Sequence, residues 1–374
     1  MATVAIFGSA GAVGIEIART MVLQPEVTRL VLFDIDKTKL DNEANDCAMI
    51  AEKMRHESVD IVARALDLAA DGNVARAFEA FEIDVAVQAA IPVSWYTLAN
   101  SVPKAIWKRV NLEARLGPFL PLLLAFPIHF MRGWQEAGAR AHVIQLSFPD
   151  VVNPVLAGMG LAPACGSGNT ENLASTLRLT IADRFDVPTA EIDLRLIAHH
   201  YHCWFMRSAS PDTDLDERPF FFRALRQQED VTEELAADPQ FLPTLRRRYP
   251  YQRPRFAATS VVKNTLRMLR QDRVISHVAS PGACGGGMEA RFGPDGWEPV
   301  LPAGVGQSDC ETIFAKARQA DGIAEIAPDG TVRFTEQGHG AMRELLGYDC
   351  PVLKPSEVQE QAGILLERIK TIRG

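Results

Sequence analysis

The sequence TVAIFGSAGAVG, at residues 3–14, decides how the rest of this chain is interpreted. Its first five residues, 3–7, are apolar like a buried strand and lead directly into a turn that contains three glycines. Residues 15–23 then show the apolar spacing of a helix, and a second apolar run at 30–33 ends at Asp34. The order strand, glycine turn, helix, strand and acid is that of a dinucleotide-binding unit.

The glycines and the acid of this unit have separate physical roles. Glycine permits a tight turn, a close approach of the backbone to a pyrophosphate, and close packing of the helix on the strand. Asp34 follows Gly14 by twenty residues, where a carboxylate accepts hydrogen bonds from ribose hydroxyls and repels a 2′-phosphate, so the pattern predicts NAD rather than NADP. The alternative is a structural glycine turn in another α/β protein. The predicted cofactor contacts in the turn are Gly8, Gly11, Ala12, Val13 and Gly14.

Length and composition limit the class of protein. With 374 residues, of which 47% are hydrophobic and 23% charged, we expect about two globular domains with cores of normal size. The net charge of −8 argues against non-specific binding of nucleic acid. The longest apolar stretch, 117–131, is shorter than a bilayer span and contains three prolines, and no basic, apolar leader precedes the first strand. The six cysteines lack CxxC spacing, so we expect reduced thiols in a cytoplasmic protein.

The N-terminal half continues to alternate apolar strands with helical segments, which is typical of a parallel sheet. Further strands are predicted at 61–66, 84–90 and 141–147. Ligands of such sheets bind beyond the carboxyl ends of the strands, so we expect Ala90 and Ser147 to line the cofactor crevice. The C-terminal half mixes helical segments with short strands, predicted at 192–198, 274–279, 288–292 and 297–301. We therefore predict a Rossmann-type doubly wound parallel sheet at 1–155 and a second, α+β substrate domain at 156–374.

These segments resemble the lactate/malate dehydrogenase superfamily over most of the chain. The resemblance is carried by the glycine turn at 8–14, the second strand at 32–36, and the segments 108–112, 166–168, 197–201 and 258–260. It implies hydride transfer between NAD and a hydroxy acid or a related secondary alcohol, by a homo-oligomer that is a dimer or a tetramer. It also implies that Arg109 polarises the substrate carbonyl, that His200 is the acid/base, and that Thr259 borders the substrate.

Three positions depart from the pattern of that superfamily. Phe148 stands at a strand end where the family usually has asparagine, which removes a polar contact near nicotinamide and substrate. Asn172 and Ser175 stand in the places of the family's acid and its substrate arginine, so we expect an altered substrate pocket. An acidic substrate needs a cation from elsewhere, and without one the substrate would be bulkier or less anionic than malate. The candidate cations are Arg178, which matches a structural arginine of the family, Arg253 and Arg255.

His200 is the candidate base because oxidation of an alcohol requires a group that takes the hydroxyl proton, and imidazole titrates near neutral pH. The ring needs a partner that fixes its tautomer, for which Asn172 and Glu171 are the candidates. The alternative is that His200 and its neighbours His199 and His202 are polar residues at a strand end with no chemistry.

Two further interpretations remain open from the sequence. The segment 199–203 contains three histidines and a cysteine, but a strand would divide them between two faces, so we predict no metal. Residues 200–205, however, resemble the histidine-tryptophan segment of an NAD- and metal-dependent glycosidase, glycosidase family four, which shares this fold, and Cys165 is the candidate for its metal-binding cysteine. The other interpretation is a protein that binds NAD and has lost its chemistry, which Phe148 and the missing arginine favour.

Overall fold

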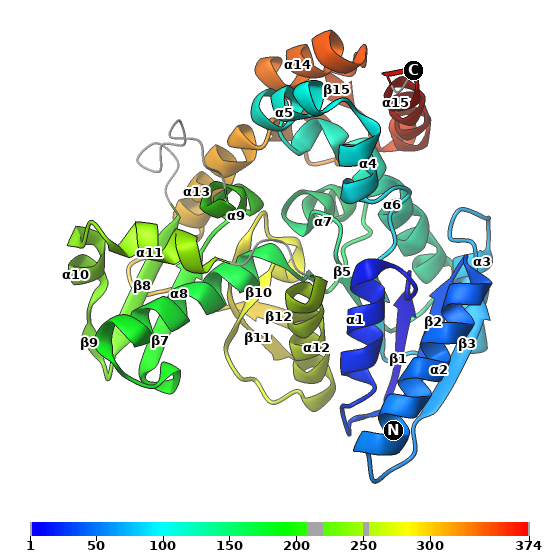
Figure 1. The fold of residues 1–374 in the computed structure, drawn as a ribbon, viewed down its shortest axis with the longest axis horizontal. Helices are drawn as coiled ribbons and strands as arrows, with labels where there is room; N and C mark the ends of the chain where they lie inside the picture. The colour runs from blue at the N-terminus through cyan, green and yellow to red at the C-terminus, as the bar shows by residue number, and fades with distance from the viewer. Residues whose placement is uncertain (1, 208–219, 250–253, 373–374) are drawn as a thin grey trace.

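The computed structural model describes residues 2–207, 220–249 and 254–372 of the chain. Arg253, one of the three candidate arginines, lies outside the described residues. The largest sheet has six parallel strands in the order β3-β2-β1-β4-β5-β6 (Figure 1). The order reverses between β1 and β4, which is where a dinucleotide-binding sheet has its crevice. The predicted Rossmann-type sheet is thus confirmed. Its strands are β1 (Ala2–Phe7), β2 (Val27–Asp34), β3 (Asp60–Ala65), β4 (Val85–Gln88), β5 (His142–Gln145) and β6 (Cys165–Gly166).

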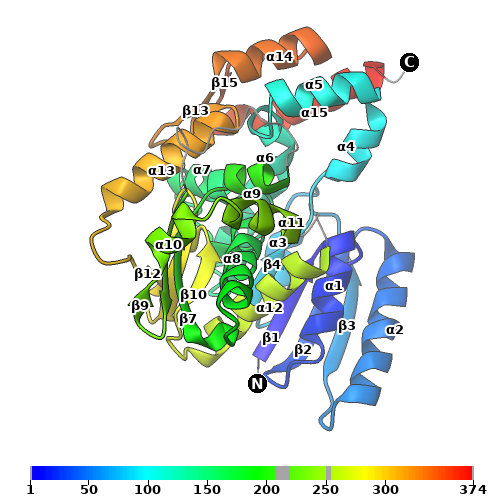
Figure 2. The same ribbon diagram turned by 60° about the vertical axis from the view of Figure 1, so that its left-hand side comes forward.

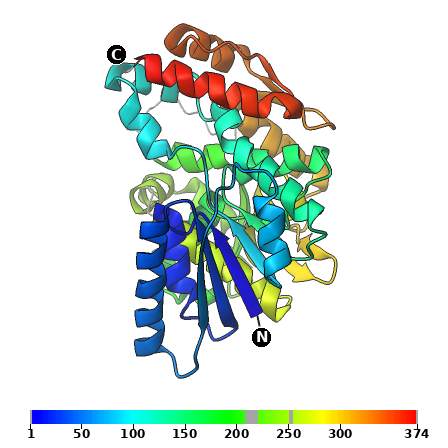
Figure 3. The same cartoon turned by 90° about the vertical axis from the view of Figure 1, so that its right-hand side faces the viewer.

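Helices cover both faces of this sheet because alternate residues of each strand point to opposite sides (Figure 3). In β1, Val4 and Ile6 belong to a buried cluster that includes α1, α2 and α12. Ala5 and Phe7 belong to a second buried cluster, which includes α3, α6 and α7. These helices are α1 (Ala12–Met21), α2 (Lys37–Met54), α3 (Asn73–Ala80), α6 (Leu120–Glu136), α7 (Pro149–Gly158) and α12 (Pro254–Arg270).

The middle of the chain forms two smaller antiparallel sheets, with strand orders β7-β8-β9 and β10-β11-β12. The predicted strand at 192–198 agrees closely with β7, and those at 274–279, 288–292 and 297–301 agree with β10, β11 and β12. The strands are β7 (Ile192–Ile197), β8 (Phe221–Arg226), β9 (Glu229–Asp230), β10 (Ser276–Ala279), β11 (Gly287–Gly293) and β12 (Gly296–Pro299). The helices of this part are α8 (Asn169–Phe185), η2 (Thr189–Glu191), α9 (His200–Arg207), α10 (Thr232–Ala237), α11 (Phe241–Arg248) and η3 (Pro281–Ala283).

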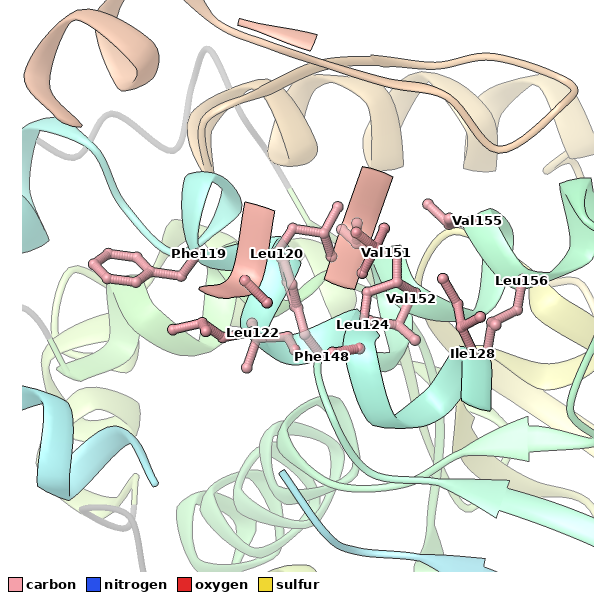
Figure 4. Close-up of a cluster of buried hydrophobic side chains, with 14 of the residues drawn as sticks. Phe119, Leu120, Leu122, Leu124, Ile128, Phe148, Val151, Val152, Val155 and Leu156 are labelled. Carbon is pink, nitrogen blue, oxygen red and sulfur yellow. The ribbon is translucent and has the colours of Figure 1, made fainter. Parts of the chain in front are cut away.

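The C-terminal part of the chain packs back onto the N-terminal half. One buried cluster joins Leu346 and Leu365 to α6, and Figure 2 shows α14 and α15 beside α4 and α5. Figure 4 shows the same cluster where α6 meets α7, with Phe148 among its members. The predicted division at residue 155 is not tested by these contacts and stays a prediction. The remaining elements are α4 (Trp95–Ser101), α5 (Lys104–Glu113), η1 (Gly117–Phe119), α13 (Gln307–Ala320), β13 (Ile323–Ile326), β14 (Val332–Phe334), α14 (Glu336–Leu346), β15 (Val352–Leu353), η4 (Pro355–Glu357) and α15 (Val358–Ile372).

Among the described helices, no single one is long and apolar enough to cross a membrane. Helix α5 and the helical segment Gly117–Glu136 reach that length and apolarity only as a pair, which is bent by 109° at the break between them. All six cysteines are free thiols.

Candidate active site

The glycine turn lies at the carboxyl end of β1, and two of its positions require glycine. Gly8 has a φ of 91°, and a Cβ there would lie 2.8 Å from the backbone nitrogen of Ala90, just beyond β4. A Cβ at Gly14, in the first turn of α1, would overlap the carbonyl oxygen of Gly8. Gly11 is the N-cap of α1 and has no side chain to bond the first N–H groups of the helix. The N-terminus of α1 is therefore open to an anion, as a pyrophosphate requires.

Asp34, at the end of β2, is fixed beside this turn by two main-chain hydrogen bonds. Its Oδ2 accepts from the N–H of Ala10 at 2.9 Å, and its Oδ1 accepts from the N–H of Asp36 at 3.1 Å. Each carboxylate oxygen can accept more than one hydrogen bond, so ribose hydroxyls can still bind there. The next residue, Ile35, is 69% exposed and lines an open cavity of about 680 Å³ together with Leu66. The cavity beyond the end of β2 is thus lined by both apolar and charged side chains, with Arg64, Asp67 and Arg76 as the charged ones.

The residues that follow β4 and β5 lie along the same edge of the sheet. Ala90 packs against Gly8, and the Ser147 hydroxyl donates to the carbonyl oxygen of Leu123 at 2.9 Å. Phe148 is buried and has a φ of 44°, a conformation that L residues rarely adopt. This position, where the resemblance led us to expect asparagine, thus has an apolar ring held by a strained backbone.

His200 begins α9 and is held by two buried carboxyl groups. Its Nδ1 lies 2.8 Å from Oδ2 of Asp321, and its backbone N–H donates to Oδ2 of Asp150 at 2.7 Å. The ring of Phe148 packs edge-on against the His200 ring, with the centroids 5.0 Å apart. Because Phe148 and Asp150 directly follow β5, these contacts fix His200 at the carboxyl edge of the parallel sheet. The His200 side chain is 11% exposed, whereas that of His199 is fully buried.

The two carboxyl groups around His200 have opposite pKa shifts. Burial alone would raise the pKa of Asp321, but His200 and His199 hold the pKa of that carboxyl well below its ordinary value. Burial raises the pKa of Asp150, against the attraction of the same two histidines. Asp321 therefore favours its ionised form more strongly than Asp150 does, and it can orient the His200 ring and stabilise its protonated form.

The structure gives His200 a different ring partner from the predicted Asn172 or Glu171. Glu171 caps the start of α8 and accepts a hydrogen bond from Nζ of Lys263 at 2.8 Å. The Asn172 side chain is half-buried and has no hydrogen bond within the described ranges. Asp321 lies 121 positions from His200 in the chain, so no local motif could have indicated it.

The other predicted substrate residues do not join this cluster in the described contacts. On α8, Ser175 is exposed and Arg178 is half-buried. On α12, Thr259 is exposed and its hydroxyl donates within its own helix. The Arg255 side chain is 73% exposed and pairs with Glu16 of α1 at 3.4 Å. These four residues stay predictions without support from a contact to the histidine.

Arg109, the predicted carbonyl-polarising residue, lies on α5. It is exposed and forms ion pairs with Glu113 at 2.7 Å and with Glu344 of α14 at 2.9 Å. These pairs bind it to the C-terminal part of the chain. Its catalytic role stays a prediction.

A second arginine, Arg115, was missed from the sequence. It lies between α5 and η1 with a φ of 65°, and its guanidinium is 3.8 Å above the ring of Trp204 on α9. Two residues further along, the N–H of Gly117 donates to the backbone oxygen of Asp321 at 2.7 Å. Arg115 is thus connected to the helix that His200 begins and to the loop that supplies the partner of its ring. Only its place just before a turn distinguishes it in the sequence.

In the parts of the chain that the structure describes, no group of three or more histidine, cysteine, aspartate or glutamate residues could hold a metal ion. Nδ1 of His199 and Nδ1 of His200 both face Oδ2 of Asp321, at 3.4 and 2.8 Å. Nδ1 of His202 accepts the N–H of His199 at 2.9 Å. These three ring nitrogens therefore have protein partners.

Comparison with solved structures finds the same fold in lactate and malate dehydrogenases. A lactate dehydrogenase from a Medee basin deep-sea metagenome library matches with a TM-score of 0.57 and 14% identity, over 85% of this chain and 96% of that one. The lactate dehydrogenase of Cryptosporidium parvum, solved with lactic acid and NAD, matches with 0.57 and 16%, over 86% and 96%. The malate dehydrogenase of Plasmodium falciparum, solved with NADH, matches with 0.52 and 12%, over 99% and 100%.

No protein-family model matches the chain, and no curated protein matches it either. The structural likenesses show that the chain has the fold of the lactate and malate dehydrogenases. The resemblance seen in the sequence is confirmed at that level. At sequence identities this low, the likeness shows the fold alone. Activity and substrate are therefore argued from the residues of the site.

Proposed function

We propose that the protein is an NAD-dependent oxidoreductase that transfers a hydride between nicotinamide and the hydroxyl-bearing carbon of a hydroxy acid or related secondary alcohol. The observation that carries the proposal is the position of His200, with Nδ1 on Asp321, at the carboxyl edge of a parallel sheet. The fold of NAD-dependent dehydrogenases supports it.

NAD fits the residues of the glycine turn. Gly8 and Gly14 permit the tight turn and its close packing against Ala90 and α1, and the uncapped start of α1 at Gly11 suits the pyrophosphate. Ala12 and Val13 would add N–H groups from the first helical turn, and Asp34 would bind the ribose hydroxyls. NAD, when bound, supplies the site that accepts or donates the hydride.

The spacing of the strands supports a place for His200 at the nicotinamide end. Neighbouring strands lie about 4.8 Å apart, and β5 is two strands from β1 in the observed order. Phe148 and Asp150, which follow β5, both contact His200. With the adenosine ribose at Asp34 on β2, the cofactor would extend past Ala90 and Ser147 toward this histidine.

In the direction of alcohol oxidation, Nε2 of His200 would take the hydroxyl proton while the hydrogen on carbon leaves with its electron pair. The proton on Nδ1 stays hydrogen-bonded to Asp321, so the imidazolium forms beside a buried anion. Arg115 would stabilise the charge that develops on the substrate oxygen. Arg109 is the alternative for that role, which the family resemblance implies.

For the substrate we propose a molecule that is bulkier or less anionic than malate. Phe148 places an apolar ring against His200, and Asn172 and Ser175 bring no charge to α8. Arg255 is paired with Glu16, so it would reach a bound carboxylate only after that pair opens. If the true substrate is an acid, we therefore expect its turnover to depend partly on Arg255 or Arg178. If it is not an acid, we expect neither arginine to affect turnover.

The proposal is tested by following the absorbance of reduced nicotinamide while the purified protein is offered NAD and a panel of secondary alcohols. The panel should include malate, lactate, and larger aliphatic and aromatic 2-hydroxy acids with their esters. We expect poor turnover of malate and lactate and faster turnover of a larger member. Tight NAD binding without any hydride transfer would support the non-catalytic alternative, and metal-dependent cleavage of a glycoside would support the glycosidase.

We also propose a subunit number and a location for the protein. A homo-oligomer, either dimer or tetramer, rests on the resemblance alone, and a cytoplasmic location rests on the cysteine pattern and composition. Light scattering on the purified protein measures the subunit number directly, and a monomer at micromolar concentration would overturn the first of them.

A further inference from the structure

Two neighbouring strands of the parallel sheet end in the same sequence pattern. Residues 87–92 read VQAAIP and residues 144–149 read IQLSFP, so each has an apolar residue, glutamine, two variable residues, an apolar residue and proline. Gln88 is the last residue of β4 and Gln145 is the last residue of β5, and the two are direct partners in the register of the sheet. Both glutamine side chains are fully buried, which is unusual for this residue type.

The two glutamines make the same hydrogen bond. Nε2 of Gln88 donates to the carbonyl oxygen of Ala90 at 2.7 Å, and Nε2 of Gln145 donates to that of Ser147 at 2.9 Å. In each case the amide bonds the residue two positions ahead and closes a small ring at the strand end. We call each ring, from the glutamine to the residue two positions ahead, a glutamine clasp.

The main-chain N–H of the middle residue of each clasp also forms a matching hydrogen bond. The N–H of Ala89 donates to the carbonyl oxygen of Phe7 in β1, and the N–H of Leu146 donates to that of Gln88 in β4. Each clasp is thus attached to the last residue of the preceding strand. The arrangement occurs at the ends of two adjacent strands, so a chance contact of one side chain does not explain it.

The clasps hold the residues that border the proposed cofactor site. The first fixes Ala90, whose backbone is so close to Gly8 that a Cβ on that glycine would lie 2.8 Å from the Ala90 nitrogen. The second fixes Ser147 directly before Phe148, whose ring packs on His200. The Gln88 clasp therefore fixes the turn beside the glycines of the proposed cofactor site. The Gln145 clasp fixes the turn beside His200.

The clasps also carry a cost in stability. The Oε1 atoms of Gln88 and Gln145 are buried and have no hydrogen-bond partner among the described residues. An unpaired buried acceptor is unfavourable, and an unbranched apolar side chain of similar length would remove that penalty. Methionine at either position should thus make the folded protein more stable, although it could not form the hydrogen bond that closes the clasp.

We propose that Gln88 and Gln145 are positioning residues of the cofactor site, which set the turns after β4 and β5 for NAD and for His200. This inference rests on the proposed function, because the residues they hold matter through NAD and the base. A residue with only a structural role should lose stability when it is replaced. A positioning residue that carries an unpaired acceptor should lose function while stability is kept or gained.

The experiment compares Gln88→Met and Gln145→Met with wild type in melting temperature, NAD affinity and turnover. We expect melting temperatures that are unchanged or higher for both variants. Gln88→Met should weaken NAD binding about tenfold, because Ala90 is then no longer held in place at the cofactor edge and must be ordered on binding. Gln145→Met should leave NAD binding within about threefold and lower kcat about tenfold, because its clasp holds the residue next to Phe148.

Three further variants keep the test decisive. Gln359→Met is the control, since Nε2 of Gln359, an exposed residue of α15, also donates to a main-chain carbonyl, that of Ala125 at 3.0 Å. It should change neither NAD affinity nor kcat. Gln88→Asn and Gln145→Asn retain an amide that is too short to close the clasp, and they replace the methionine variants if those fail to fold.

Hydrogen exchange in the cofactor-free protein gives a readout that does not depend on activity. We expect faster exchange confined to 89–91 in Gln88→Met and to 146–148 in Gln145→Met. The inference is overturned if both variants lose stability and binding together, or if both behave like Gln359→Met. If the wild type itself binds no NAD, the proposed function fails, and that result is separate from any difference between the variants.

Discussion

The glycine turn and the His200 cluster lie at the same edge of one sheet, but they are built in different ways. The turn is made of main-chain atoms from residues 8–14, and its bonded acid, Asp34, is 24 positions from Ala10. The cluster is made of side chains from three distant segments, because Asp150 and Asp321 lie 50 and 121 positions from His200. The turn depends on glycines, which have no side chain, whereas the cluster depends on side chains that folding brings together.

This difference has a consequence for how each region responds to change. Local steric fit decides the turn, so a single added methyl group is enough to disturb it. The cluster depends on the docking of the C-terminal part of the chain, which supplies Asp321 at the end of α13. Binding of the cofactor and transfer of the proton should therefore be separable by mutation.

Removal of the base should have the largest effect. We expect His200→Ala to reduce turnover by about 10²–10⁴-fold, the usual contribution of a general acid–base group. NAD affinity should stay within about threefold, because the turn that holds the cofactor does not include this residue. Steady-state kinetics with calorimetric titration of NAD would check this, with His339→Ala on α14 as the control. Equal losses of turnover and NAD affinity would contradict the separation of the two regions.

Loss of the ring partner should come next. We expect Asp321→Asn to reduce turnover by about 10²-fold, since the amide cannot stabilise the imidazolium as a carboxylate does. The pKa of Asp321 is held below its ordinary value in the folded protein. Its charge therefore stabilises the fold above the ordinary carboxyl pKa of about 3.9, and this stability is lost as the pH falls through the lower folded pKa.

The free energy of unfolding measured against pH would show this contribution. The stability advantage of wild type over Asp321→Asn should be full near pH 7 and should shrink below about pH 4. An advantage that still grows as the pH falls below about 4 would show that the carboxylate is not the stabilised form.

The two arginines sharpen the comparison because one was predicted from a local segment and the other was found by its contacts. We expect Arg115→Gln to lower kcat by about 10²-fold, as for loss of one donor to a developing oxyanion. Arg109→Gln removes ion pairs at the surface and should cost less than about threefold. Parallel assays of both variants decide between them, and a larger loss in Arg109→Gln would restore the role that the resemblance implies.

Within the turn, alanine substitutions at two glycines should differ in their effect on the stability of the protein. A Cβ at Gly14 would overlap the carbonyl oxygen of Gly8, whereas a Cβ at Gly11 would meet only that oxygen, at 3.3 Å. We expect Gly14→Ala to lower the free energy of unfolding by about 1–3 kcal/mol, as overpacking does. Gly11→Ala should change it by less than about 0.5 kcal/mol. Denaturant titrations that rank the two variants in the opposite order would contradict the geometry of the turn.

The smallest effect is expected at the acid of the turn. Asp34 should disfavour a 2′-phosphate, so wild type is expected to bind NAD more tightly than NADP. Asp34→Ser should narrow this difference by about tenfold or less, because serine removes the negative charge that repels the 2′-phosphate. Calorimetric titration with both cofactors measures the ratio. Tighter binding of NADP by the wild type would remove the assigned role of Asp34.

The fold and the turn could be predicted from the sequence because their signals are local. The run that ends at Phe7, the glycines and Asp34 lie within one strand-helix-strand unit, where spacing alone indicates structure. The partner of His200 could not be predicted in this way. Asp321 is one aspartate among many until the chain folds, and α8, where the partner was expected, uses Glu171 to bind Lys263. Arg115 was missed because its position depends on Trp204, which belongs to another segment.

The origin of the Asp321 carboxylate also has a consequence for the order in which the protein gains its properties during synthesis. A ribosome makes the glycine turn, both ends of the cofactor edge and His200 before it makes α13. A nascent chain can therefore offer a complete nucleotide turn while its imidazole still lacks the anion that orients it. Competence for proton transfer would arrive late in translation, with the docking of the loop that bonds Gly117.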